Sequence, residues 1–153
     1  MFSNPILHNI VTMGLWSAVF TTVAVMVFAA SEKVSVWSPI NAIAHIFFGD
    51  EALGVDRPVT KYLVSGTILN LGAALGWAAI AEFGYYFLKI SAGHVFPTVA
   101  LSVAVTVLAY ITDFVIVPKR LTPGFEHVLS RRSLYLVYGV LALALTLGGL
   151  QRV

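Results

Sequence analysis

Two carboxylates lie in stretches of this chain that are otherwise almost free of charged side chains. Glu82 lies within the apolar run between Lys61 and Lys89, and Asp113 lies within a second apolar run that ends at Pro118. Ionisable side chains in such apolar runs are rare, and they mark ion or proton pathways or internal hydrogen-bond networks. Both carboxylates are therefore candidate proton- or ion-binding residues.

The depths of the two carboxylates decide whether they can act together. A helical rise of 1.5 Å per residue places Glu82 roughly 10 Å outward of the middle of its helix and Asp113 about 9 Å inward of its own. A separation of roughly 20 Å excludes the paired acid–base chemistry of glycosidases and aspartic proteases. We expect instead one polar layer at each depth. The inner layer contains Thr22, Asn70, Asp113 and Tyr135, and the outer layer contains Thr12, Glu82, Ser102 and Thr146.

Two interpretations of these layers remain open. The carboxylates either bind protons or small cations in a water-filled cleft, or they fix the register of the helices through internal hydrogen bonds. For Asp113 we favour the structural interpretation, with Asn70 and Tyr135 as hydrogen-bond partners, or with Arg120, Arg131 or Arg132 as an ionic partner. For Glu82 the structural and functional interpretations are more evenly matched, because its own span offers no cation within two turns except Lys89.

The histidines suggest a metal or haem alternative. His8 and His94 are expected at the outer end with Glu82, and imidazole with carboxylate suits a transition metal. His45 and His127 are expected at the inner end, and two histidines on each side are compatible with bis-histidine haem ligation. All four lie at the edges of apolar runs rather than inside them, where interfacial hydrogen bonding is the commoner role. The many aromatic residues also leave a quinone possible, so the cofactor is unknown.

No catalytic motif is recognisable. The chain contains no HExxH, GxSxG, GxxxxGK[ST] or GxGxxG pattern, and no Ser–His–Asp set stands out. Cysteine is absent, which excludes disulfides, thiolate catalysis and cysteine-ligated zinc or iron–sulfur sites. We therefore favour a non-enzymatic protein.

The composition requires that these residues be held in a membrane. Of the 153 residues, 59% are hydrophobic and only 10% are charged, and the mean hydropathy is +0.91. Soluble domains carry about 25% charged residues. Apolar runs long enough to cross a bilayer predict helices over residues 9–30, 62–88, 97–117 and 133–150. The expected fold is a single all-α domain over residues 1–153, an integral membrane four-helix antiparallel bundle.

The connection between the first two spans contains a further short helix. Ser38 and Pro39 are typical of a helix start, which predicts a helix over residues 39–48. This helix is too short to cross a bilayer, so we expect an interfacial or re-entrant helix.

Small residues in the 62–88 helix predict how the spans pack. Gly72 and Gly76 form a small-xxx-small step, and Gly66 lies earlier in the same helix. Because helices in lipid associate through close backbone approach at such residues, we expect these glycines to pack helices together. The 62–88 helix is accordingly expected at the centre of the bundle.

The basic residues predict orientation. Seven lie on the side of loops 31–60 and 118–132, against two on the side of the termini. The positive-inside rule therefore predicts cytoplasmic loops, with both termini outside, in what we expect to be a bacterial inner membrane. Four of the loop residues are expected to contact anionic lipid head groups: Lys119, Arg120, Arg131 and Arg132.

Three functional hypotheses follow. The first is a non-enzymatic accessory or assembly subunit, or a homo-oligomer, that works through helix–helix contacts with other membrane subunits or with itself. The second is a transporter or channel for protons or small cations that uses Glu82 and Asp113. The third is a haem-, metal- or quinone-binding membrane subunit. A nucleic-acid partner is not expected, because the net charge is only +2 and the basic residues are clustered.

Overall fold

The computed structural model describes residues 4–153, and within that range the secondary structure is helical with no β-strand. Four helices are long and apolar enough to cross a membrane. They are α1 (Pro5–Ser31), α4 (Thr60–Phe87), α5 (Val95–Ile111) with its π-helical continuation η2 (Thr112–Ile116), and α6 (Arg131–Leu150). These bounds agree closely with the predicted spans. The first helix begins earlier than expected, because Asn4 caps it through a hydrogen bond to the Ile6 N–H and Pro5 takes the first helical position.

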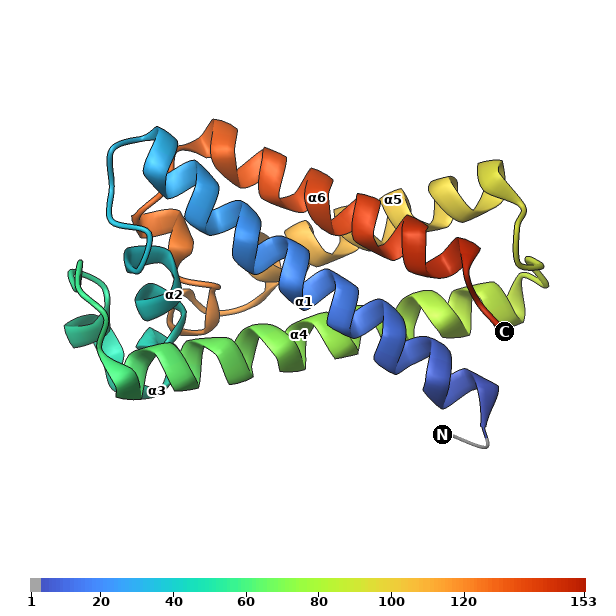
Figure 1. Cartoon of the computed structure of the whole chain (residues 1–153), viewed down its shortest axis with the longest axis horizontal. Coiled ribbons are helices and arrows are strands. Elements are labelled where there is room, and N and C mark those ends of the chain that lie inside the picture. Colours follow the sequence, from blue (N-terminus) through green and yellow to red (C-terminus); the bar gives the residue numbers. More distant parts are fainter. Residues whose placement is uncertain (1–3) are drawn as a thin grey trace.

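The four long helices lie alongside one another (Figure 1). Helix α1 packs against both α4 and α6, and α6 also packs against α5. The beginning of α1 and the end of α6 lie at the same end of the molecule as the short α4–α5 connection. The opposite end holds α2, α3 and the loop that precedes α6.

The expectation that the 62–88 helix occupies the centre is wrong. Only 17% of the most apolar stretch of α4 is buried, against 50% for α6. Close backbone approaches also occur on α1 and α6, since a Cβ added to Gly14 would meet Leu75 of α4 and one added to Gly148 would meet Met13 of α1. Close helix packing is therefore not confined to the glycines of α4.

The three glycines predicted to pack α4 behave differently from one another. Gly66 is buried, and a Cβ added there would collide with the backbone carbonyl of Ile40. Gly72 and Gly76 are exposed, and an added Cβ would have nothing within 4 Å at either position. The internal helix packing expected at Gly72 and Gly76 is therefore not found within the described chain.

The predicted 39–48 helix is two short helices, α2 (Ser38–Ile43) and α3 (His45–Phe48), followed by the 3-10 turn η1 (Gly49–Ala52). All six residues of α2 are buried, and the helix packs against α1, α4 and the 3-10 turn η4 (Phe125–His127). The Asn41 Nδ2 donates to the carbonyls of Val55 and Arg57 at 3.0 and 2.8 Å, which ties α2 to the loop before α4. A helix lying flat at an interface keeps one face exposed, and α2 does not.

The loop that precedes α6 is tied to the end of α1 by one carboxylate. It contains the 3-10 turns η3 (Lys119–Leu121) and η4, and Ser130 then caps α6. Glu32 accepts hydrogen bonds from the Ser130 hydroxyl, the Ser133 hydroxyl and the Ser130 N–H. These bonds hold the pKa of Glu32 below its ordinary value of 4.5.

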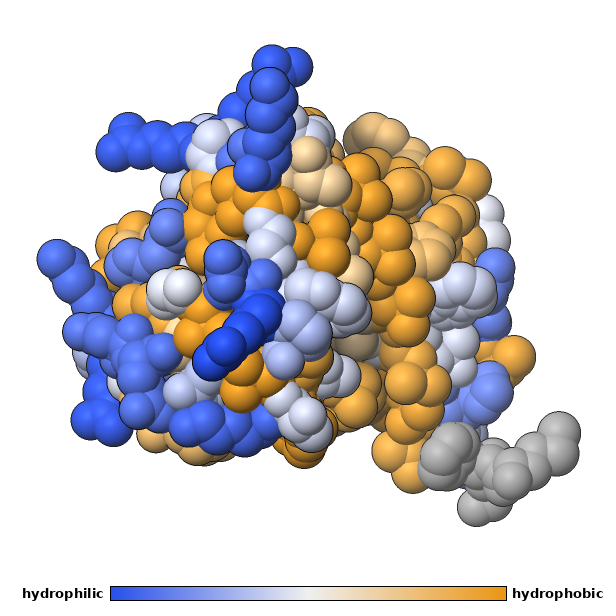
Figure 2. All heavy atoms as spheres, turned by 60° about the vertical axis from the view of Figure 1, so that its left-hand side comes forward, coloured by the Kyte–Doolittle hydropathy of each residue, from blue (hydrophilic) through white to orange (hydrophobic). Residues whose placement is uncertain are grey.

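The sides of the molecule are apolar and its loop end is hydrophilic. Along α1, Val19, Val23 and Val27 are 55%, 53% and 55% exposed and form one stripe at helical spacing. In Figure 2 the long hydrophilic side chains gather on the loop end, and hydrophobic residues cover much of the flank. Monomers that fold in water rarely expose apolar surface of this extent.

Candidate functional site

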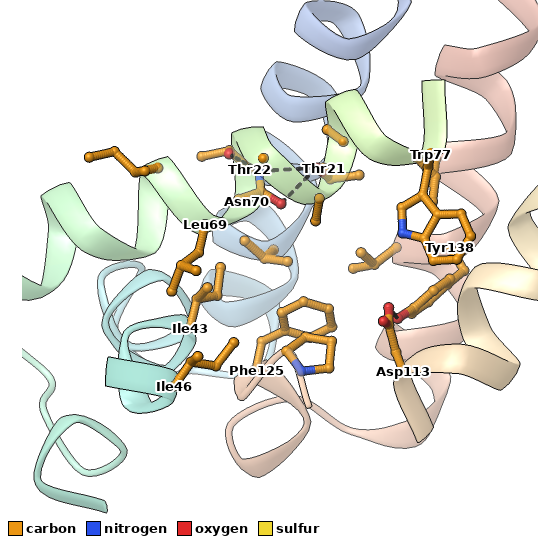
Figure 3. A pocket seen from close by; sticks show the side chains of 18 of the residues that line it. Thr21, Thr22, Ile43, Ile46, Leu69, Asn70, Trp77, Asp113, Phe125 and Tyr138 are labelled. Carbon is orange, nitrogen blue, oxygen red and sulfur yellow. Dashed lines mark hydrogen bonds between the residues drawn. The ribbon is translucent and has the colours of Figure 1, made fainter. Parts of the chain in front are cut away.

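A largely apolar cavity of about 500 Å³ lies toward the loop end of the molecule. Side chains from α1, α2, α3, α4, α6 and the loop before α6 form its walls, and most of them are aliphatic or aromatic. Figure 3 shows two polar groups facing each other across it, Asn70 with Thr21 and Thr22 on one side and Asp113 with Tyr138 on the other. The cavity therefore joins an apolar interior to two hydrogen-bonding ends.

Asp113 reaches the cavity from the π-helical segment η2. The Val117 N–H donates to the Thr112 carbonyl at 3.0 Å, a five-residue step that widens the last turn before Pro118. Single π turns of this kind occur frequently at functional sites. The Tyr138 hydroxyl donates to Asp113 Oδ2 at 2.5 Å, which orients the carboxylate beside the cavity.

Asn70 forms the opposite polar end. Its side-chain amide donates to Thr22 Oγ1 at 3.0 Å and to the Ala18 carbonyl at 3.2 Å. The Thr21 hydroxyl donates to the Ser17 carbonyl of its own helix at 2.7 Å. Asn70 thus fixes α4 against α1 while it remains part of the cavity wall.

The structure brings the expected inner layer together only in part. Asn70 donates a hydrogen bond to Thr22, which is another residue of the predicted inner layer, and it lines the same cavity as Asp113. Tyr135 is 60% exposed and stacks near Tyr110, with ring centroids 5.7 Å apart, so it is not the partner of Asp113. The expected ionic partners Arg120, Arg131 and Arg132 form no ion pair with Asp113.

Tyr138 and Trp77 both line the cavity, and the sequence offered them only as two of the many aromatic residues that left a quinone possible. Tyr138 follows Tyr135 by three residues and so lies on nearly the same helix face. Depth along the membrane cannot separate the two tyrosines, because only the rotation of α6 decides which one reaches Asp113. Trp77 looked like an ordinary core residue, and nothing in the sequence distinguished it.

Glu82 belongs to a second cavity, of about 550 Å³, at the end of the molecule opposite the loops. Its Oε1 accepts from the Asn9 amide at 2.9 Å, and its Oε2 lies 3.6 Å from Arg152 Nη1. The guanidinium of Arg152 lies over the Tyr85 ring, 3.9 Å from its centroid, and donates to the Ile90 carbonyl. Tyr85 in turn bonds Ser102 at 3.0 Å.

This arrangement gives Glu82 a packing role. The side chains of Arg152 and Glu82 are only 9% and 6% exposed, so the pair is held inside the protein. Of the expected outer layer, Ser102 enters the network through Tyr85, whereas Thr12 and Thr146 do not bond Glu82. Arg152, which sequence reasoning counted only as a terminal charge, is the missing cation.

The two carboxylates lie in cavities that share no lining residue among the described residues. This separation agrees with the depth argument.

The histidines do not form the expected metal or haem sites. Within residues 4–153, no three His, Asp or Glu side chains come together as a metal ion requires, so the set of His8, His94 and Glu82 is not assembled. His45 is buried with Nδ1 2.8 Å from the Ala42 carbonyl, and its ring lies 6.2 Å from that of His127. Neither cavity is lined by a histidine of the described chain, so neither offers haem an axial ligand.

The basic residues expected at lipid head groups are exposed at the loop end. They are Lys119, Arg120, Arg131 and Arg132.

Comparisons with protein-family models, with curated proteins and with solved structures give no match for this chain. Its function therefore has to be argued from the two cavities and the side chains around them.

Proposed function

We propose that this protein holds a lipophilic small molecule in the cavity between Asn70 and Asp113. In this proposal the protein is not an enzyme, and its four long helices form an antiparallel bundle in a membrane. The cavity itself carries the proposal. Small-molecule sites typically measure about 300–1,000 Å³ and are mostly apolar with a few convergent polar groups. A cavity of about 500 Å³ with Asn70 at one side and the Asp113–Tyr138 pair at the other fits that description.

Exposed apolar stripes support insertion in a bilayer. The α1 stripe of Val19, Val23 and Val27 has a counterpart on α5, where Val103 and Val107 are 47% and 52% exposed. Charged side chains gather at the loop end, as head-group contact requires. In this arrangement loops 31–60 and 118–132 face the cytoplasm and both termini face outward. Helix α2 is then a re-entrant helix, and the membrane is a bacterial inner membrane.

The cavity is placed to receive its ligand from the bilayer. Its rim includes Ile68, which is 61% exposed, and the exposed small residues Gly72 and Ala73. In a membrane this side of α4 faces acyl chains. A lipophilic molecule can therefore enter sideways, without crossing water.

A tryptophan in the wall provides the test. Trp77 lines the cavity, whereas Trp16 and Trp37 do not. In a Trp16→Phe/Trp37→Phe background, the neutral heavy-atom quencher 4-bromobiphenyl is expected to quench Trp77 fluorescence saturably, at one site per chain. Gly72→Leu should remove the saturable component because the new side chain fills the rim of the cavity.

Gly76→Leu is the matched control. Gly76 is an exposed α4 glycine with nothing within 4 Å of an added Cβ, as Gly72 is, but it does not line the cavity. Quenching that rises linearly without saturation, or that both leucine variants reduce equally, would contradict the proposal.

A second candidate function is association through α4 with another membrane subunit or a second copy. The observation that favours it is the exposed small-xxx-small step, since a Cβ added to Gly72 or Gly76 would have nothing within 4 Å among the described residues. Both Gly72→Leu and Gly76→Leu should then disrupt a complex isolated from membranes, whereas Gly139→Leu on α6 should not. Gly139 is also exposed with free space around it. A monomeric wild-type protein that never purifies with a partner would remove this candidate.

A further inference from the structure

The cavity ends in a carboxyl group, that of Asp113, which has no ionic partner. Asp113 accepts one hydrogen bond from Tyr138, and no ion pair among the described residues joins it to a lysine, arginine or histidine. A carboxylate in apolar surroundings with no cationic partner is strongly disfavoured unless it is protonated or a cation is supplied. The contrast with Glu82 is direct, because Glu82 has Arg152.

A second acidic side chain, Glu126, lies in η4 directly after Phe125, which lines the cavity. Its Oε2 is buried without a hydrogen-bond partner, and its Oε1 lies 3.8 Å from His127 Nε2. Neither Asp113 nor Glu126 has a lysine or arginine within ion-pair distance, so a cation bound beside Asp113 would compete with no basic side chain for the carboxylate.

The walls near Asp113 suit an organic cation better than a hydrated metal ion. Trp77, Phe125 and Tyr138 present aromatic rings to the same cavity, and Figure 3 shows Trp77 and Tyr138 grouped beside the carboxylate. Aromatic faces attract desolvated cations, most strongly for tryptophan. Metal ions would require several oxygen or nitrogen ligands around one point, and no such cluster is assembled within residues 4–153.

We propose that the cavity selects lipophilic organic cations, with Asp113 as the counter-ion and the aromatic wall as the surface that receives the cation's apolar body. This inference rests on the proposed function and adds the charge of the ligand to it. The side-chain oxygen of Asn70, at the far side, can accept a hydrogen bond from a polar group at the other end of a longer ligand, since its amide nitrogen already donates to Thr22 and Ala18.

The test compares two ions of the same shape and opposite charge, tetraphenylphosphonium and tetraphenylborate, by equilibrium dialysis with the full-length protein in a neutral detergent. Asp113→Asn keeps the shape of the side chain and removes its charge. We expect it to weaken tetraphenylphosphonium binding at least about tenfold while tetraphenylborate binding stays the same or tightens. Asp56→Asn, an identical change in an exposed loop outside both cavities, should alter neither.

An Asp113→Asn protein that binds tetraphenylphosphonium as tightly as the wild type, or that loses both ions equally, would overturn the inference. Quenching of Trp77 by 4-bromobiphenyl separates the two levels of the argument. If Asp113→Asn keeps saturable quenching but shows no change in charge preference, the ligand site stands and the cation assignment fails. If the wild type shows no saturable quenching, the proposed function itself fails.

Discussion

Glu82 and Asp113 are similar side chains in similar apolar helices, and their surroundings give them different roles. The buried pair of Glu82 and Arg152 removes two charges from water, and its attraction barely offsets that desolvation. Removing only one partner destabilises the protein, since the remaining charge is left buried and uncompensated. The Glu82 network is therefore stable only as a complete unit.

The Glu82–Arg152 pair yields a stability prediction. Arg152→Met should lower the free energy of unfolding by about 3 kcal/mol, because Glu82 then keeps only the Asn9 amide as a partner. The double variant Glu82→Met/Arg152→Met should recover most of this loss, since no charge remains buried. Unfolding in mixed detergent micelles measures both. A double variant less stable than Arg152→Met alone would contradict this account of the site.

At the residue scale, the sequence identified the polar groups better than their partners. Asn70, Glu82 and Asp113 stand out because their side chains are unusual within apolar runs. Their partners do not, since Tyr138 and Asn9 are recognisable only once the rotation of each helix is known. Arg152 could have been matched to Glu82, because both belong to the outer end of the predicted bundle.

At the element scale, Glu32 joins the end of α1 to the first turn of α6. The hydroxyls of Ser130 and Ser133 and the Ser130 N–H all donate to it, so three hydrogen bonds depend on its negative charge. Such bonds favour the ionised carboxylate and hold its pKa in the folded protein below 4.5.

This link predicts a pH-dependent stability. Because the folded pKa of Glu32 is depressed, its stabilisation is fully present above about pH 4.5 and is lost as the pH falls through the folded pKa. The contribution is about 1 kcal/mol or less, since the site lies near solvent. Melting temperatures of the wild type and Glu32→Gln should differ at pH 7 and converge toward pH 3. A difference that stays constant over this range would show that the charge is irrelevant.

The elements themselves were predictable where composition dominates. Apolar length fixes the four long helices, and Pro118 stops the third one. Glycine spacing was a poor guide to contacts, because an added Cβ at Gly72 or Gly76 would meet nothing within 4 Å, while Gly66, Gly14 and Gly148 make close approaches. Spacing shows that a helix can be approached closely, but the helix that approaches is set by the whole packing arrangement.

At the scale of the whole molecule, topology is the next prediction. The chain has no cysteine, so a single introduced cysteine is a unique label. Ala92→Cys, in the exposed α4–α5 connection, should react with a membrane-impermeant maleimide added outside intact cells. Gly54→Cys, exposed in the connection before α4, should react only after the cells are opened. The reverse pattern would show that the positive-inside argument fails for this protein.

The architecture followed from the sequence more readily than the site did. The cavity arises from the buried α2, the π turn at Asp113 and the rotation of α6, and none of these is visible as a pattern of residues. Asp113 and Asn70 could be identified from the sequence, but the cavity between them could not.

The most direct measurement uses the three tryptophans as internal reporters. In deuterated lipid bicelles, nuclear Overhauser effects from the protons of biphenyl to each indole N–H show which tryptophan the molecule contacts. We expect a strong effect at Trp77, which lines the cavity, and none at Trp77 in Gly72→Leu. Effects at Trp16 alone, which is 43% exposed on the flank of α1, would mean that biphenyl stays in the lipid and that the cavity holds nothing.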